Sequence, residues 1–176
     1  IIKVYMRVPA ESLRKFLSGK GSLSGQEESF IDAAKKYNLN ECYLAAHSAL
    51  ETGNGRPTGM GGGRVFKGKK VYNMYGICAS DNNQRIGALG TAYKKEWFSP
   101  DVAIIKGVEW ISTHFINSKK HSQNTLYKMK WNPVYHEYAT GVNWADEIAR
   151  NMMQTCGFDF SFANHEIVFD IPEYEK

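Results

Sequence analysis

The stretch with the clearest chemical potential is LAAHSALETGNG, residues 44–55. Its one acid, Glu51, stands two residues before the run Gly53, Asn54 and Gly55, residues that favour the left-handed backbone with which helices end. The negative end of a helix and the apolar neighbours both disfavour an anion, so we expect this carboxyl group to keep its proton. That is what a general acid requires. The plain alternative is a solvated glutamate at a helix end.

A second acid is harder to find. Between Glu51 and Glu96 the one acidic residue is Asp81, which follows YNMYGICAS. Asp81 could lie on the rim of a site and face Glu51. In the run Asp-Asn-Asn it could equally satisfy its own backbone in a turn. Both interpretations stay open.

Four segments in order carry a family resemblance. A helix ending in AxxSxxETGxG and a later YNMYGI resemble the bacterial glucosaminidases of glycoside hydrolase family seventy-three, in the lysozyme-like superfamily. The matching residues are Ser48, Glu51, Thr52, Gly53, Gly55 and the run from Tyr72 to Ile77. QNTLYKMKWNP (Gln123 to Pro133) and EYAT (Glu137 to Thr140) also resemble family segments, so the similarity covers roughly residues 25–155.

This resemblance implies a cell-wall autolysin. The expected activity is that of an endo-β-N-acetylglucosaminidase, which hydrolyses peptidoglycan at the β-1,4 bond between N-acetylglucosamine and N-acetylmuramic acid, with Glu51 as general acid. The alternatives are a muramidase or lytic transglycosylase on the same fold, or a non-catalytic peptidoglycan-binding module. The last is motivated by the hairpin, which lacks the carboxylate that relatives often place there. No metal and no other cofactor is expected.

The resemblance also implies roles for other residues. Tyr138, in EYAT, would lie near the acid and orient the substrate's acetamido group or stabilise positive charge. Asn73 would hold the acetamido group, Tyr75 would stack on a sugar, and Trp131 would complete the groove. The plain alternatives are a buried turn residue for Asn73 and core aromatics for the tyrosines.

The mechanism stays open between several schemes. A separation of about 5 Å between Glu51 and Asp81 would suggest nucleophilic assistance, and about 6.5–9.5 Å would leave room for a water and give inversion. The substrate's own acetamido group could instead act as nucleophile and give retention.

Periodicity and capping residues predict a mainly helical (α+β) fold. Helices are expected over 9–17, 24–37, 40–51 and 84–97, from 99 through about 115, over 125–129, and from 143 to 156. Core-facing residues are expected to be Val102, Ile105, Val108, Ile111 and Phe115 in one helix, and Trp144, Ile148, Met152 and Cys156 in another. Val65-Phe66 and Val71-Tyr72 flank Lys-Gly-Lys and predict a β-hairpin. Residues 1–8 and 166–171 are strand-like or extended. The result is a lysozyme-like helical domain with a small β-hairpin lobe flanking a substrate groove.

Length and composition suit one globular domain over residues 1–176. Its core is expected at about 25–157, with an arm and helix in 1–24 and an extension in 158–176. The net charge of +4 suits a polyanionic wall and is too small to indicate nucleic-acid binding. No membrane span and no signal peptide is evident. From the resemblance we expect a monomer that is secreted to the bacterial cell wall, with an export signal that lies outside this sequence.

The cysteines and histidines give no further site. Cys42, Cys78 and Cys156 are odd in number and widely spaced, so we expect buried free thiols. His47 and Ser48 are adjacent on a helix and point in different directions, which excludes a catalytic dyad.

Overall fold

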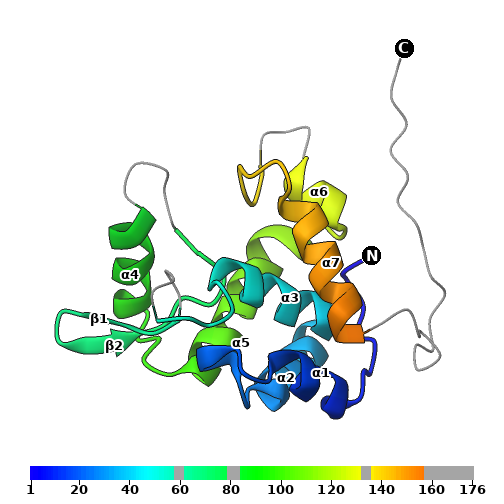
Figure 1. Cartoon of the computed structure of the whole chain (residues 1–176). Helices are drawn as coiled ribbons and strands as arrows, with labels where there is room; N and C mark the ends of the chain where they lie inside the picture. The colour runs from blue at the N-terminus through cyan, green and yellow to red at the C-terminus, as the bar shows by residue number, and fades with distance from the viewer. Residues whose placement is uncertain (58–61, 79–83, 132–135, 157–176) are drawn as a thin grey trace.

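The computed structural model describes residues 1–57, 62–78, 84–131 and 136–156. Its helices are α1 (Ala10–Leu17), η1 (Gly21–Leu23), α2 (Glu27–Tyr37), α3 (Glu41–Glu51), α4 (Gln84–Lys94), α5 (Pro100–Ile111), η2 (Ser112–Ile116), α6 (Leu126–Lys130) and α7 (Trp144–Cys156). Strands β1 (Arg64–Phe66) and β2 (Lys69–Val71) form an antiparallel hairpin in which Val65 pairs with Lys70. The predicted helical fold with one small hairpin is confirmed (Figure 1).

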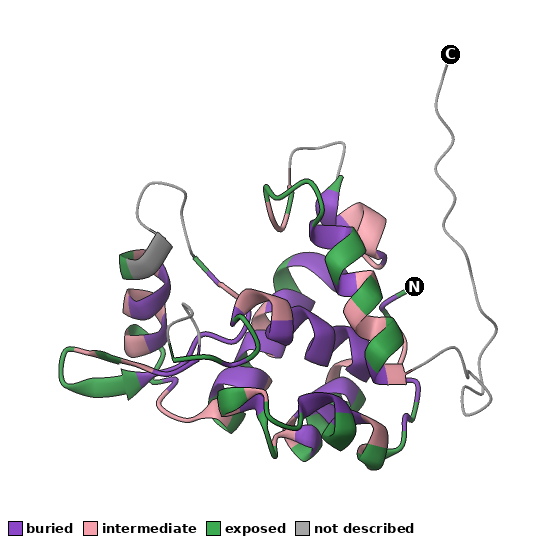
Figure 2. Cartoon of the chain, in the orientation of Figure 1, coloured by how far each residue is buried: buried purple, intermediate pink, exposed green. Residues whose placement is uncertain are grey.

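Helix α3 is the centre of the fold. Every residue from Glu41 to Ala49 is buried, and the helix packs most extensively against α7 (Figure 2). Asn40 caps it as predicted, because its side-chain oxygen accepts a hydrogen bond of 3.0 Å from the backbone N–H of Tyr43. A helix surrounded on all sides can hold its last residue in a fixed place.

The core-facing stripe predicted for α5 and η2 is confirmed at Val108, Ile111 and Phe115, which are buried, but it differs at the start of α5. Val102 is 37% exposed and Ile105 is half-buried, whereas Ile104 and Gly107 are buried. A Cβ at Gly107 would lie 2.5 Å from the Tyr75 ring, so the helix meets this ring along its glycine. The expectation was wrong for Val102, and the close packing along Gly107 widens the buried face to include Ile104, while Ile105 packs at its edge. The segment that follows, η2, is a π-helical turn.

In α7 the predicted core face is confirmed in its first half. Trp144 and Ile148 are buried, and Met152 and Cys156 are half-buried.

The first residues form an extended arm without a strand partner in the part of the chain that the structure describes. The backbone N–H groups of Met6 and Val8 donate to the carboxylate of Glu41, at 3.0 and 2.6 Å. Glu41 has no exposed surface, and its burial raises the pKa of this carboxyl group. The arm is thereby fixed to the first turn of α3.

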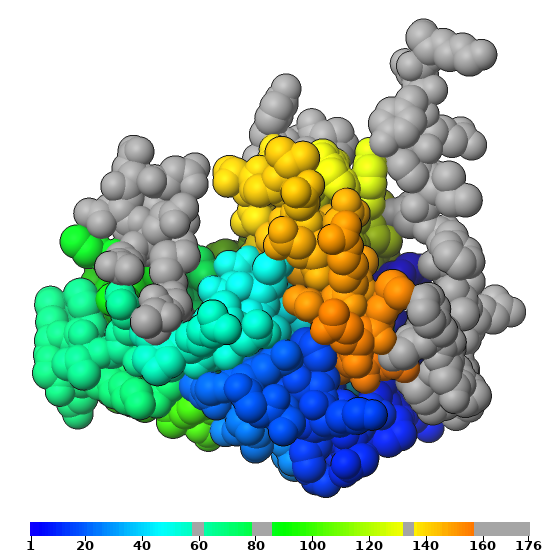
Figure 3. Space-filling view, in the orientation of Figure 1, coloured from blue at the N-terminus to red at the C-terminus, as the bar shows by residue number. Residues whose placement is uncertain are grey.

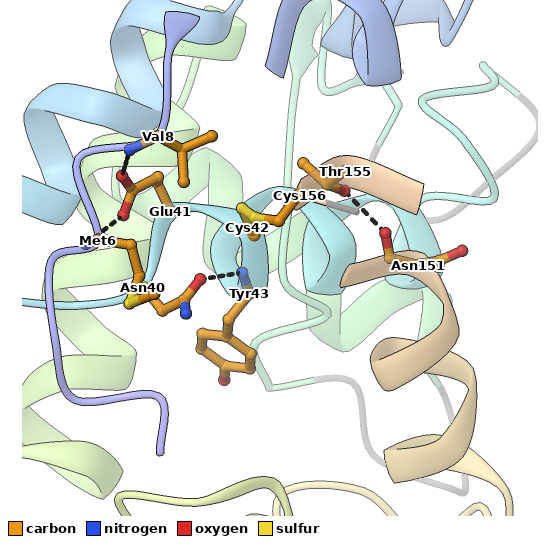
Figure 4. Close-up of a disulfide and its surroundings, with 9 residues drawn as sticks. All are labelled: Met6, Val8, Asn40, Glu41, Cys42, Tyr43, Asn151, Thr155 and Cys156. Carbon is orange, nitrogen blue, oxygen red and sulfur yellow. Dashed lines mark hydrogen bonds between the residues drawn. A yellow bond between two sulfur atoms is a disulfide. The ribbon is translucent and has the colours of Figure 1, made fainter. Parts of the chain in front are cut away.

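Two of the predicted free thiols are joined. Cys42 and Cys156 form a disulfide with a Cα–Cα distance of 6.2 Å across 114 residues of sequence (Figure 4). The expectation of free thiols was therefore wrong for this pair, because the packing of α3 against α7 brings together cysteines whose spacing gave no sign of it. Cys78 is free, as predicted, but it is exposed rather than buried.

Three sequence predictions lie outside the described residues, namely Asp81, the extension over 158–176 and the strand-like stretch 166–171 within it. Within the described ranges, no helix combines the length and the apolar character needed to cross a membrane.

Candidate active site

Glu51 is the last residue of α3, and the turn after it is fixed by its own hydrogen bonds. The Thr52 hydroxyl donates to the carbonyl of Ser48 at 2.7 Å and accepts from the N–H of Gly55 at 2.8 Å. Gly53, Asn54 and Gly55 have φ of 58°, 63° and 68°, the left-handed backbone predicted for the helix end.

Close backbone contact holds this turn against the preceding part of the chain. The N–H of Ser22 donates to the carbonyl of Gly55 at 3.0 Å. A Cβ at Gly55 would lie 2.3 Å from the carbonyl oxygen of Lys20, so no larger residue fits without movement. The position of Glu51 is thus set by backbone packing on both sides.

The carboxyl group of Glu51 is largely enclosed, with its side chain 18% exposed. Its Oε1 accepts a hydrogen bond of 3.0 Å from the indole N–H of Trp144, at the start of α7. On its other side lies Gly76, where a Cβ would come within 2.6 Å of Oε2. Trp144 therefore fixes the orientation of the Glu51 carboxyl group, and the missing side chain at Gly76 leaves space for its Oε2, as a positioned proton donor requires.

Figure 3 shows a hollow in the surface between two lobes. One lobe contains α4 and the β-hairpin, and the other contains α6 and the start of α7. The segment at the end of α3 lies at the base of this hollow. The predicted groove thus borders the end of the helix that carries Glu51.

Tyr138 lies close to Glu51, in the wall of the candidate site. Its hydroxyl donates to the backbone carbonyl of Tyr75 at 2.5 Å, and its ring packs against that of Trp144 with centroids 5.5 Å apart. Burial, and then the charge of Glu51, raise the pKa of the Tyr138 phenol well above its usual value. Tyr138 therefore lies in the site as a neutral phenol, and its hydroxyl hydrogen is used in the bond to the Tyr75 carbonyl.

Asn73 and Tyr75 lie in the same loop, but in the interior. The Asn73 amide donates to the carbonyls of Ile77 and Ala88 and accepts from the N–H of Ile77, at 2.9, 3.1 and 3.0 Å. Tyr75 has no exposed surface. These contacts give both residues a part in holding the loop that places Gly76 beside Glu51. Their contact with substrate stays a prediction, and one that this burial does not favour.

Trp131 directly follows α6 and is 44% exposed. Its ring contacts that of Tyr127, with centroids 5.2 Å apart. Of the aromatic side chains predicted for the groove, Trp131 keeps the open face that stacking on a sugar would need.

Three residues around Glu51 were missed by the sequence reasoning. Trp144 was predicted only as a core residue, and nothing in the spacing connects it with an acid 93 positions earlier. Gly76 was part of a family-like segment without a role of its own. His47 was dismissed, yet its Nε2 lies 3.6 Å from Oε1 of Glu51, and the one available signal was its position four residues before the acid.

The described residues contain no group of three or more His, Cys, Asp or Glu side chains arranged to hold a metal ion. The chemistry that this geometry offers is proton transfer by one enclosed carboxyl group.

Comparison with known proteins agrees with this geometry. Residues 27–156 match the glucosaminidase family, described as mannosyl-glycoprotein endo-beta-N-acetylglucosaminidase. The chain is 41% identical over 162 residues to a beta-N-acetylglucosaminidase of Bacillus subtilis, covering 92% of this chain and 18% of that protein. It is 41% identical over 176 residues to a bifunctional autolysin of Staphylococcus epidermidis, covering 94% of this chain and 13% of that protein. The chain thus spans less than a fifth of the length of these two relatives.

Solved structures of autolysins share the fold. Staphylococcus aureus autolysin E in complex with the muropeptide NAM-L-Ala-D-iGlu has a TM-score of 0.75 and 34% identity, over 88% of this chain and 69% of that chain. A catalytic mutant of autolysin E, with glutamate replaced by alanine, in complex with the disaccharide NAG-NAM has a TM-score of 0.72 and 35% identity, over 84% of this chain and 66% of that chain.

Proposed function

Because the chain belongs to the glucosaminidase family, we propose that it is a glycoside hydrolase of bacterial peptidoglycan. It acts as an endo-β-N-acetylglucosaminidase and cuts the β-1,4 bond between N-acetylglucosamine and N-acetylmuramic acid. The observation that carries the proposal is Glu51 at the end of α3, enclosed between Trp144 and Gly76. The NAG-NAM disaccharide held by the autolysin E mutant supports the substrate class.

In this proposal Glu51 is the general acid. It protonates the oxygen of the leaving sugar as the glycosidic bond breaks, and it recovers a proton from the water that completes the hydrolysis. Trp144 fixes the carboxyl group so that the reacting oxygen faces the groove.

The second group is Asp81 or the substrate's own acetamido group. Asp81 would hold a water or assist directly from the rim, and the acetamido group would form a cyclic intermediate without a protein nucleophile. The anomeric configuration of the first product separates inversion from retention. The Asp81→Asn variant distinguishes the two candidates: loss of activity would favour Asp81, and retained activity would favour the substrate's acetamido group.

The remaining predicted residues differ in whether they contact the substrate directly. Trp131 stacks on a sugar through its exposed face, and Tyr138 lines the site beside Glu51 with its ring. Asn73 and Tyr75 act through the loop that places Gly76 rather than through direct contact.

We place the enzyme in the bacterial cell wall, outside the membrane, acting as a monomer. The Cys42–Cys156 disulfide supports an oxidising compartment, where such bonds persist. The net charge of +4 suits approach to an anionic wall. The relatives named autolysins support the same location.

The test is a gel containing cell walls, on which wild type and Glu51→Gln are compared. The wild type is expected to clear the wall, and the variant to lose about 100- to 10,000-fold in rate, since glutamine keeps the shape but carries no acidic proton. Glu109→Gln is the matched control, because Glu109 is exposed and paired with Lys106. Wall binding with no clearing by wild type would make the chain a non-catalytic binding module.

A further inference from the structure

His47 lies in the interior directly beside the proposed acid. It has no exposed surface and stands four residues before Glu51 on α3. Its ring meets those of Tyr138, Trp144 and Tyr75 edge to face, with centroids 4.6, 5.1 and 5.2 Å apart. Enclosed by these rings, the imidazole has only its two nitrogens for polar contact.

One of these nitrogens has a partner and the other does not. Nδ1 of His47 lies 3.1 Å from the hydroxyl oxygen of Tyr43. Nε2 is buried without a hydrogen-bond partner among the described residues, and 3.6 Å separates it from Oε1 of Glu51. This distance is too long for a hydrogen bond. A buried polar atom left unpaired is costly, and the cost is explained if Nε2 waits for a charge that develops during catalysis.

We propose that His47 is a positioning residue for the catalytic proton of Glu51, an inference that rests on the proposed function. The Tyr43 hydroxyl donates to Nδ1, so the ring hydrogen sits on Nε2 and points at Oε1 of Glu51. Trp144 directs its indole N–H at the same oxygen. With two N–H groups aimed at Oε1, the acidic proton is held on Oε2, the oxygen beside Gly76.

The proton then has one defined course. The Oε2–H bond of Glu51 breaks and the proton goes to the glycosidic oxygen, which keeps the electron pair of the breaking C–O bond. The negative charge left on the carboxylate draws the Nε2–H of His47 into a hydrogen bond with Oε1. When a water attacks the sugar, one of its protons returns to Oε2. His47 neither gives nor takes a proton.

In the described part of the chain, the other titratable groups near this carboxyl group are three tyrosines and one cysteine. They are Tyr43 on α3, Tyr75 and Cys78 in the segment after β2, and Tyr138 before α7. Burial raises the pKa of all three phenols, and the charge of Glu51 raises it further for Tyr43 and Tyr138. From α7 the facing group is the indole of Trp144, which does not titrate.

Three variants separate this role from simple packing. His47→Phe keeps the aromatic contacts and removes both nitrogens. His47→Gln places an amide N–H near the former Nε2. His114→Phe is the matched control, because His114 is exposed and stacks on Trp110. The kinetic constants kcat and KM are measured on a soluble peptidoglycan oligomer across pH, and circular dichroism checks that each variant is folded.

For His47→Phe we expect kcat to fall about tenfold with KM unchanged, the size of one lost hydrogen bond to a charged group. The alkaline limb of its kcat–pH profile should move to higher pH, because the deprotonated carboxylate loses an N–H donor. His47→Gln should recover about a third or more of the wild-type kcat, and His114→Phe should match the wild type. Equal losses in the Phe and Gln variants, or a folded His47→Phe with the wild-type profile, would overturn the inference.

A direct measurement covers the case in which His47→Phe fails to fold. The ¹⁵N shifts of the His47 imidazole in the wild type report which nitrogen carries hydrogen. We expect a protonated Nε2 and a bare Nδ1, with this preference weakened in Tyr43→Phe. A hydrogen on Nδ1 in the wild type would overturn the inference. This readout does not depend on activity, so an inactive wild type would count against the proposed function and leave the tautomer test intact.

Discussion

The indole N–H of Trp144 donates to Oε1 of Glu51 at 3.0 Å, joining the first residue of α7 to the last residue of α3. These two helices pack against each other more extensively than any other pair of described elements. The hydrogen bond therefore couples the main packing interface of the fold to the orientation of its proposed catalytic group.

Replacing Trp144 by phenylalanine should separate this hydrogen bond from packing. The variant keeps a ring against His47 and Tyr138 but loses the N–H, so we expect kcat/KM to fall about 10- to 100-fold. Melting temperature should change little by comparison. Trp110→Phe, at a residue that stacks on His114 instead, should keep full activity. Equal rates for the two variants would contradict the role given to Trp144.

Two glycines allow backbone strain to be told apart from crowding of the acid. Gly76 and Gly68 have φ of 63° and 76°, so alanine at either position is expected to cost about 1–2 kcal/mol of stability. At Gly76 the new Cβ would also lie 2.6 Å from Oε2 of Glu51, whereas nothing lies within 4 Å at Gly68. Gly76→Ala should therefore lose most activity and Gly68→Ala should keep it, with similar shifts in the urea midpoint. A fully active Gly76→Ala would mean that Oε2 does not need this space.

The disulfide should stabilise the fold substantially. It closes 114 residues of sequence, and we expect the Cys42→Ala/Cys156→Ala double variant to lose about 2–4 kcal/mol of unfolding free energy. Denaturant unfolding with and without a reducing agent measures this. Cys78→Ser is the control, since Cys78 is free and exposed. A thiol titration of the chain unfolded in denaturant without reductant should find one reactive group, and three would show that the bond is absent.

His136 should make stability fall in mild acid. Burial lowers its pKa below the ordinary 6.5, and the charges of His121, Lys120 and His114 lower it further. The unfolded chain therefore takes up this proton first, and the unfolding free energy decreases as the pH drops below about 6.5. His136→Gln should show a shallower decrease between pH 7.5 and 5.5 in urea titrations. Parallel slopes for the two chains would contradict the assignment.

Local features of the fold were predictable because they depend on neighbouring residues. Asn40 marks the start of α3, and the Gly-Asn-Gly run marks its end, since capping and left-handed turns are short-range effects. The hairpin followed in the same way from the turn at Lys67-Gly68. Glu51 could be singled out because its position depends on one helix end.

What could not be predicted depends on packing between distant segments. Cys42 meets Cys156 only because α3 lies along α7, and nothing in their spacing indicates the pairing. Glu41 was unremarked because a charged residue in a first helical turn normally faces solvent, whereas here the N-terminal arm folds over it. The substrate contact expected of Asn73 stays a prediction, and the hydrogen bond of its amide to the carbonyl of Ala88 had no signal in the sequence.

The most direct test of the account is the identity of the sugar ends that the enzyme creates. Purified peptidoglycan is digested, the new reducing ends are reduced with borohydride, and the fragments are identified by mass spectrometry. The account predicts reducing-end N-acetylglucosamine, produced by the wild type and not by Glu51→Gln. Reducing-end N-acetylmuramic acid or its 1,6-anhydro form would contradict it and make the enzyme a muramidase or a lytic transglycosylase.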